Sequence, residues 1–248
     1  MEHYYLDNGL LENYWNGQRR VASMAKEYTR FFIKEPLRKK ILKSGVKVCP
    51  CICISRNIGV GALEIAGIIG EMLGLQVMDR QILEKIACSA NLSRSSIKTF
   101  DERYPGKLKE LMCQILGERS FGMNDYARHL FYVAFFLAHS ESVVFVGRGI
   151  HLMLPRNRVF AVRLICERKK RVKRLAKALE TDLKDAGQVL DQAEKEQYEF
   201  FHRVHGKDTA PASEFDMVMN LDYIKEPQTA ALAISELFKS QFHDIVRH

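Results

Sequence analysis

Short apolar runs alternate with stretches of helical periodicity from residue 46 onward. The apolar runs predict strands at 46–55, 75–79, 142–147, 158–166 and 215–221. The runs at 142–147 and 158–166 lack polar alternation, which indicates strands covered on both faces. Apolar residues three or four positions apart predict helices at 63–73, 124–139, 167–180, 185–201 and 226–242, with further helices at 80–90, 93–100 and 106–119. This order predicts an α/β domain built around a parallel sheet.

Residues 1–45 have a different pattern, in which aromatic side chains are mixed with lysine and arginine. One or two helices are predicted here, interrupted before Pro36 and ending at a turn at 44–45. We therefore divide the chain into a helical N-terminal extension, 1–45, and an α/β domain, 46–248. The extension is expected to pack on the domain, although a basic helix with aromatic residues can instead contact a protein partner or a membrane surface.

Composition narrows the class of ligand only slightly. The 248 residues include 38 Lys+Arg and 30 Asp+Glu, a formal charge of +8, which favours anionic ligands such as nucleotides, nucleic acid or acidic lipid. The first residues are acidic, so no secretory signal is expected. The apolar run 130–138 is far shorter than the ~20 residues that span a bilayer. We expect a cytoplasmic protein without a transmembrane segment.

The six cysteines do not form the C-x-x-C pairs typical of zinc or redox sites. Cys49, Cys51 and Cys53 alternate, so in a strand they share one face and behave as small apolar side chains. No metal site is expected from them, and reduced thiols fit a cytoplasmic location.

A turn with glycines at 59 and 61 joins the first predicted strand to the first predicted helix. Compared with the Walker A pattern G-x-x-x-x-G-K-[ST], Gly61 takes the second glycine position, while Ala62 and Leu63 replace the lysine and the hydroxyl residue. Backbone amides and the helix dipole still favour an anion at this point. We expect Arg56 to supply the missing positive charge, because a guanidinium can bind phosphate through two N–H groups.

The stretch ISRNIGVGALEIA (54–66) resembles the I-S-R-x-x-G-S-G-G-x-E-I-A signature of the cytidylate kinase-like family, a branch of the P-loop nucleoside monophosphate kinases. Five further segments resemble motifs of that family in the same order: VMDRQIL (77–83), VFVGRGIHLMLP (144–155), ERKKRVKRLAK (167–177), EFFHRVHGKD (199–208) and EFDMVMNLDYI (214–224). The resemblance covers about residues 46–242.

The resemblance implies a three-layer α/β fold of the P-loop NTPase type, with a central parallel sheet, a helical insert and a mobile lid. It also implies phosphoryl transfer from ATP, with Mg²⁺, to a nucleoside monophosphate or a similar small acceptor. Such catalysis consists mostly of positioning and charge neutralisation. Cationic side chains should therefore surround the transferred group.

The expected site residues follow from the same resemblance, position by position. Phosphate contacts are expected from the loop residues Ser55, Arg56, Asn57, Gly59, Gly61 and Ala62. The expected catalytic arginines are Arg148, Arg171 and Arg174, and the expected acceptor contacts are Arg148 and Asp79. Asp79 is equally compatible with capping the helix that follows it. In the lid, Arg203 and Lys207 are expected to close on the triphosphate, and His202 and His205 are expected on the surface.

Departures from the family pattern leave a second function open. Gln197 stands where a lid arginine is expected, and the loss of such an arginine costs on the order of 10³ in rate. Gly149 replaces an acidic residue. The chain is therefore expected to be an active kinase or, alternatively, a catalytically weak or inactive kinase fold that binds nucleotide or a protein partner. A nucleic-acid binder is not favoured, because no known reading motif accompanies the positive charge.

Overall fold

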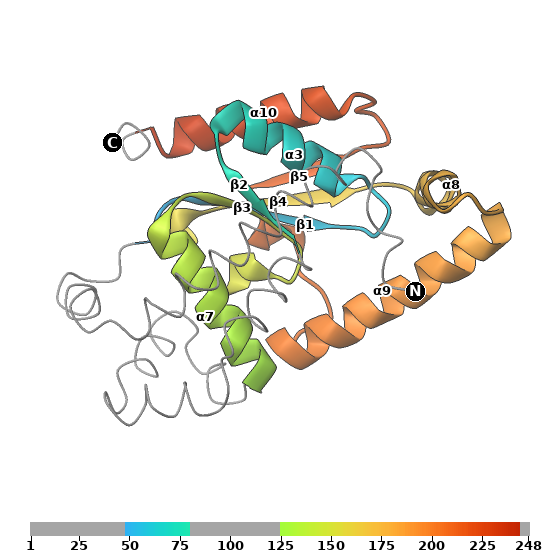
Figure 1. Cartoon of the computed structure of the whole chain (residues 1–248), viewed down its shortest axis with the longest axis horizontal. Coiled ribbons are helices and arrows are strands. Elements are labelled where there is room, and N and C mark those ends of the chain that lie inside the picture. Colours follow the sequence, from blue (N-terminus) through green and yellow to red (C-terminus); the bar gives the residue numbers. More distant parts are fainter. Residues whose placement is uncertain (1–47, 80–124, 244–248) are drawn as a thin grey trace.

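The computed structural model describes residues 48–79 and 125–243 (Figure 1). The predicted N-terminal extension, 1–45, and the helices expected at 80–90, 93–100 and 106–119 lie outside the described residues. None of the helices within the described residues has the length and apolar character that crossing a membrane requires.

Five strands form one parallel sheet, as the sequence predicts. They are β1 (Cys51–Arg56), β2 (Gln76–Met78), β3 (Val143–Val146), β4 (Val159–Ile165) and β5 (Met217–Asn220), and their order in the sheet is β2-β3-β1-β4-β5. The central strand, β1, lies between β3 and β4. It starts directly after Pro50, later than predicted, because proline has no N–H for the hydrogen-bond ladder.

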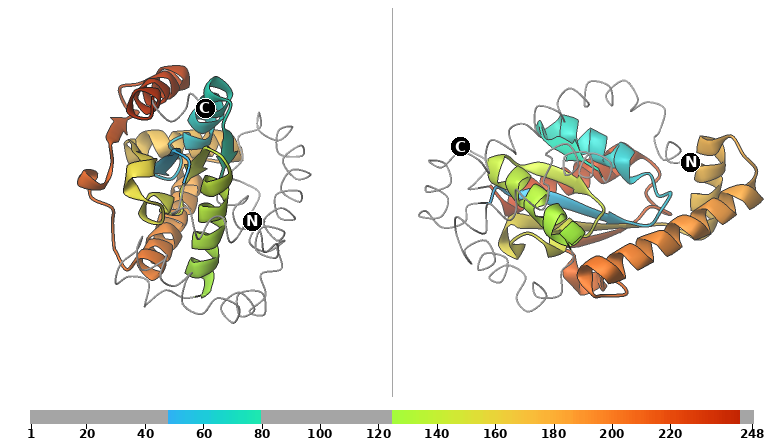
Figure 2. Two further views of the ribbon diagram at one scale, coloured as in Figure 1. Left: turned by 90° about the vertical axis from the view of Figure 1, so that its left-hand side faces the viewer. Right: turned by 60° about the horizontal axis from the view of Figure 1, so that its bottom comes forward.

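Helices on both faces of the sheet produce three layers (Figures 1 and 2). One face carries α3 (Ala62–Leu73) and α10 (Pro227–Gln241), and the other carries α7 (Asp125–Ser140). Short 3₁₀ helices lie at Ile150–Leu152 (η3), Arg156–Arg158 (η4) and Ala212–Glu214 (η5).

Alternate residues of β1 point to the two layers. Ile52 and Ile54 are buried in the cluster that includes α3 and α10, so Cys51 and Cys53 point to the opposite face, where both are buried. Burial raises the pKa of the Cys51 thiol to about 12. This thiol therefore stays protonated and packs as an apolar side chain.

Two further helices, α8 (Arg168–Leu179) and α9 (Leu183–His205), form a hairpin after β4 (Figure 1). Asp182 caps α9, because its carboxylate accepts a hydrogen bond from the Asp185 N–H at 2.8 Å. Ile58, in the β1–α3 connection, packs with Val172 of α8 and Leu190 of α9 in a small separate core. The helical hairpin is thus attached directly to the loop that the sequence marks for phosphate.

Candidate phosphate-binding site

The glycine loop follows the central strand, at the carboxyl edge of the sheet, where open parallel sheets bind ligands. Gly59 has φ +76° and Gly61 has φ +83°, both in the left-handed region that favours glycine. Gly61 is also the N-cap of α3, and no side chain among the described residues caps this helix end. The first amides of α3 are therefore open to an anion.

The backbone of the loop is held from the β4–α8 side. Asn57 accepts a hydrogen bond from the Cys166 N–H at 3.3 Å through Oδ1. Arg171 donates from Nη1 to the Ile58 carbonyl at 3.1 Å and from Nε to the Cys166 carbonyl at 3.0 Å. Nη1 of Arg171 also lies 2.5 Å from Oε1 of Glu194 in α9, and this arginine is only 7% exposed. Arg171 thus fixes the loop rather than facing solvent.

A second arginine of α8 lies against the loop itself. A Cβ atom placed on Gly61 would be 2.5 Å from Cζ of Arg174, so the guanidinium group occupies the space beside this glycine. The same guanidinium forms an ion pair with Glu64, in the first turn of α3. Arg174 therefore brings positive charge to the loop from another helix, although Ala62 replaces the Walker lysine.

Arg56, the last residue of β1, contacts α9. Its Nη1 donates a hydrogen bond to Oε1 of Gln197 at 2.9 Å, and Nε2 of Gln197 donates to the Arg56 carbonyl at 3.4 Å. Gln197, which departs from the family's lid arginine, is thus a neutral partner for Arg56. The expectation that Arg56 binds phosphate stays a prediction.

Arg148 follows β3 and also contacts α9. Its guanidinium lies 3.9 Å from the centroid of the Phe200 ring, and its carbonyl accepts a hydrogen bond from Nε2 of His205 at 2.9 Å. A Cβ atom on Gly149 would overlap the His205 ring, which explains why this position has no side chain. His205 is 8% exposed, so the expectation that it lies on the surface is wrong, whereas His202 is exposed as expected.

One face of α9 thus contacts three of the predicted site arginines in sequence. Its residues Glu194, Gln197 and Phe200 are three positions apart and therefore share a helix face. They contact Arg171, Arg56 and Arg148, respectively. The helix that the family resemblance identifies as the lid lies on these arginines.

The two lid cations have other surroundings. Arg203 is exposed in the last turn of α9, and Lys207 forms an ion pair with Glu214. Asp79 directly follows β2 at the same edge of the sheet as the loop. The expected functions of these three residues stay predictions.

Helix α8 begins with four consecutive basic residues, 168–171, and has no acidic residue in its first turn. Positive side chains are unfavourable at the positive end of a helix dipole. Partners in other elements compensate three of them: Asp191 for Arg168 at 2.7 Å, Asp222 for Lys170 at 3.2 Å, and Glu194 for Arg171 at 2.5 Å.

A pocket of about 140 Å³ adjoins the loop. It is lined by loop and α3 residues, by the start of α8, and by the β5–α10 connection: Gly59, Val60, Gly61, Glu64, Ile65, Cys166, Lys170, Arg174, Leu221, Ile224, Lys225, Glu226, Pro227 and Ala230. Partial burial and a hydrogen bond to Asp222 raise the pKa of the Cys166 thiol, which stays protonated at neutral pH.

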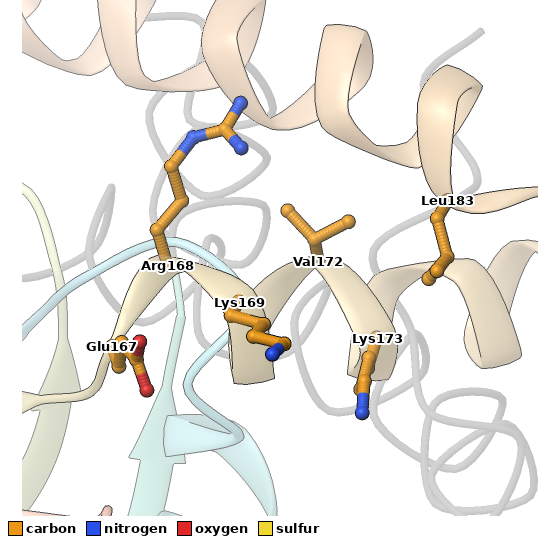
Figure 3. Close-up of a pocket in the computed structure, with 6 residues that line it drawn as sticks. All are labelled: Glu167, Arg168, Lys169, Val172, Lys173 and Leu183. Atoms are coloured by element: carbon orange, nitrogen blue, oxygen red, sulfur yellow. The ribbon is translucent and has the colours of Figure 1, made fainter.

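A larger hollow of about 390 Å³ lies along α8 and the start of α9 (Figure 3). Its lining includes Lys169, Lys173 and Leu183 but no residue of the glycine loop. Lys169 and Lys173 project from the helix on a different side from Arg168 (Figure 3). The smaller pocket is therefore the one connected to the predicted chemistry.

The expectation of magnesium stays a prediction, because Mg²⁺ at kinase sites is held mainly by substrate phosphates, waters and one or two carboxylates. Leu63 stands where a Walker loop has its metal-binding hydroxyl, and no group of three His, Cys, Asp or Glu within 48–79 and 125–243 is arranged to hold a metal ion. The glycine cradle itself fits a phosphate, because its two left-handed glycines adjoin an open helix N-terminus and a guanidinium.

Sequence reasoning missed two polar contributors to this region. Arg163 in β4 donates a hydrogen bond from Nη1 to Oγ of Ser55 at 2.8 Å, and a lone arginine in an apolar strand was the available signal. Glu64 was visible as the acid of the loop signature, but its arginine partner is 110 positions away in the sequence.

The parallel sheet, its strand order and the glycine loop before α3 define an α/β fold of the P-loop kinase type. A model of the cytidylate kinase-like family matches residues 51–223, and the chain therefore belongs to that family.

Comparison with solved structures supports the fold. An uncharacterized protein from Eubacterium ventriosum ATCC 27560 has a TM-score of 0.57 at 16% identity, covering 77% of this chain and 98% of that one. A gluconokinase from Sinorhizobium meliloti 1021 has a TM-score of 0.45 at 16% identity, covering 82% and 99%. A shikimate kinase from Bacteroides thetaiotaomicron has a TM-score of 0.38 at 14% identity, covering 78% and 98%.

At this identity the first similarity shows the fold alone, and the TM-scores of the other two are too low to add to it. A comparison with curated proteins gave no match.

Proposed function

We propose that this protein binds a nucleoside triphosphate at loop 57–61 and transfers its terminal phosphoryl group to a nucleoside monophosphate or a similar small acceptor. The observation that carries the proposal is the guanidinium of Arg174 beside Gly61, at the open N-terminus of α3. Family membership supports a kinase-like activity in general. ATP, when bound, would supply the phosphoryl group.

The residues of this chain would position the reactants and neutralise their charge. The left-handed glycines let backbone N–H groups approach the phosphates, and Arg171 holds the loop in that shape through the Ile58 carbonyl. Arg174 would replace the Walker lysine as the cation of the loop. Arg148, at the end of the neighbouring strand, is proposed to bind the acceptor phosphate.

The first test is calorimetry with ATP on the wild type, Arg174→Ala and Lys173→Ala. Lys173 is the matched control, because it is exposed on the same helix and outside the pocket at the loop. A hydrogen bond to a charged group contributes about 1.5–3 kcal/mol, so Arg174→Ala should weaken ATP binding by about 10- to 100-fold. Lys173→Ala should bind as the wild type does. Equal affinity in all three proteins would refute the proposed site.

A second candidate, nucleotide binding without turnover, is favoured by Leu63 and Gln197, which replace two groups that phosphoryl transfer uses. ADP release should be measured with ATP, magnesium and a panel of nucleoside monophosphates. Turnover that Arg148→Ala abolishes would support the kinase. Thermal stabilisation by ATP without any turnover would support the second candidate, because ligand at 100 Kd adds about 2.7 kcal/mol to stability.

A further inference from the structure

The Arg174–Glu64 ion pair joins α8 to α3 beside the glycine loop. Both side chains line the 140 Å³ pocket. Arg174 is 45% exposed and Glu64 is 39% exposed. Exposed ion pairs contribute little to folding, so this pair can be broken without loss of the fold.

The carboxylate of Glu64 has surroundings that suit a phosphate. It belongs to the first turn of α3, where the helix dipole favours negative charge. It also holds the guanidinium that lies against Gly61. Glu64 is therefore an internal anion that interacts with two positive groups, the N-terminus of α3 and Arg174. A phosphate bound at this loop would use the same two groups.

The two α8 arginines at the loop, Arg171 and Arg174, differ in their exposure to solvent. Arg171 is buried and bonded to the Ile58 carbonyl, the Cys166 carbonyl and Glu194. Arg174 extends to a half-exposed carboxylate. Sites for small molecules usually measure about 300–1,000 Å³, and the pocket at the loop measures about 140 Å³. A rotation of Arg174 or Glu64 would widen it, whereas Arg171 is fixed.

We infer that Glu64 is a displaceable counter-ion: it holds Arg174 at the loop in the empty protein, and an incoming polyphosphate takes its place on the guanidinium. This inference rests on the proposed phosphate site and adds a positioning residue to it. Glu64 then lowers the affinity for polyphosphate, because each binding event must break the ion pair. A carboxylate that held magnesium for the nucleotide would have the opposite effect.

The test is calorimetry with inorganic tripolyphosphate, and separately with ATP, in the absence and presence of magnesium. The proteins are the wild type, Glu64→Gln, Glu71→Gln and the double variant Glu64→Gln/Arg174→Ala. Glu71 is the matched control, since it is an exposed acid on the same helix and its loss changes the net charge equally. Thermal unfolding of each variant establishes that it is folded.

We expect Glu64→Gln to bind tripolyphosphate and ATP about 3-fold or more tightly than the wild type, without a requirement for magnesium. Glu71→Gln should bind as the wild type does, and the gain should disappear in the double variant. The inference fails alone if the wild type binds but Glu64→Gln binds no more tightly, if Glu71→Gln gains equally, or if the gain survives without Arg174. It fails together with the proposed function if none of the proteins binds either ligand.

Discussion

At the scale of single residues, two positions require glycine, because a side chain from a distant element occupies the space that a Cβ atom would need. Gly61 adjoins the guanidinium of Arg174, and Gly149 adjoins the imidazole of His205. Both glycines also have φ in the left-handed region. Conformational freedom and close approach therefore both require glycine at these positions.

Gly61→Ala should separate these two requirements when it is compared with Gly74→Ala. Both positions are left-handed, so each alanine should cost about 1–2 kcal/mol of unfolding free energy. Within the described residues no neighbouring atom lies within 4 Å of a Cβ on Gly74, whereas a Cβ on Gly61 meets Arg174. Urea unfolding should show similar losses, and calorimetry should show weakened ATP binding only in Gly61→Ala. Equal binding by both variants would contradict the close packing of Arg174 on the loop.

His151 provides a residue-scale prediction about pH. Its side chain is buried, and burial lowers its pKa from 6.5 to about 4, although Nε2 lies 3.8 Å from Oε2 of Glu214. The unfolded chain then binds a proton at a higher pH than the folded protein does, so stability falls as pH drops from about 6.5 to about 4. One pKa unit corresponds to about 1.4 kcal/mol, so the loss is at most about 3 kcal/mol.

Urea unfolding at several values between pH 7 and pH 4 measures this loss. His151→Phe should have a shallower pH dependence across this window, because phenylalanine does not titrate. The comparison concerns the slope, so a constant packing difference between the two proteins does not affect it. A variant with the slope of the wild type would show that other groups cause the acid sensitivity.

At the scale of elements, the main feature of α9 is that one of its faces contacts three arginines of the predicted site. Glu194, Gln197 and Phe200 contact arginines that follow or belong to three different elements: α8, β1 and β3. A neutral residue at 197 suits this arrangement, since an arginine there would face Arg56. The contact with Arg56 thus gives an electrostatic reason for the departure from the family pattern at position 197.

Gln197→Arg should therefore destabilise the protein by about 1 kcal/mol, because it replaces a hydrogen bond with two like charges. The exchanged pair Arg56→Gln/Gln197→Arg should recover part of this loss. Gln192→Arg is the control on the same helix, as Gln192 is exposed and pairs with Glu196 rather than with Arg56. Urea unfolding of the wild type, Arg56→Gln, Gln197→Arg and the exchanged pair gives the coupling free energy, and a value near zero would mean that the contact does not stabilise α9.

At the scale of the whole molecule, the sequence predicts helices and strands better than it predicts which distant residues contact one another. The strands β3 and β4 were recognisable because burial on both faces leaves no polar alternation. The loop was recognisable because glycine spacing before a helix has a specific backbone meaning. Both signals lie within a few neighbouring residues.

Contacts between distant segments could not be predicted in the same way. The approach of Arg174 to Gly61 depends on how α8 packs on α9 and on Ile58. The burial of His205 depends on a missing side chain at Gly149. Neither relation leaves a local pattern, so the sequence indicated which arginines belong to the region but not which one lies at the loop.

The four basic residues that begin α8 have a consequence for how the protein folds. On its own this segment opposes its own helix dipole; acids carried by α9 and by the β5–α10 connection offset part of that cost, and Val172 of α8 packs with Leu190 of α9. We therefore expect the segment to become helical only after those elements have docked. Arg174, which the same helix carries, would then reach the glycine loop only once α8 has docked.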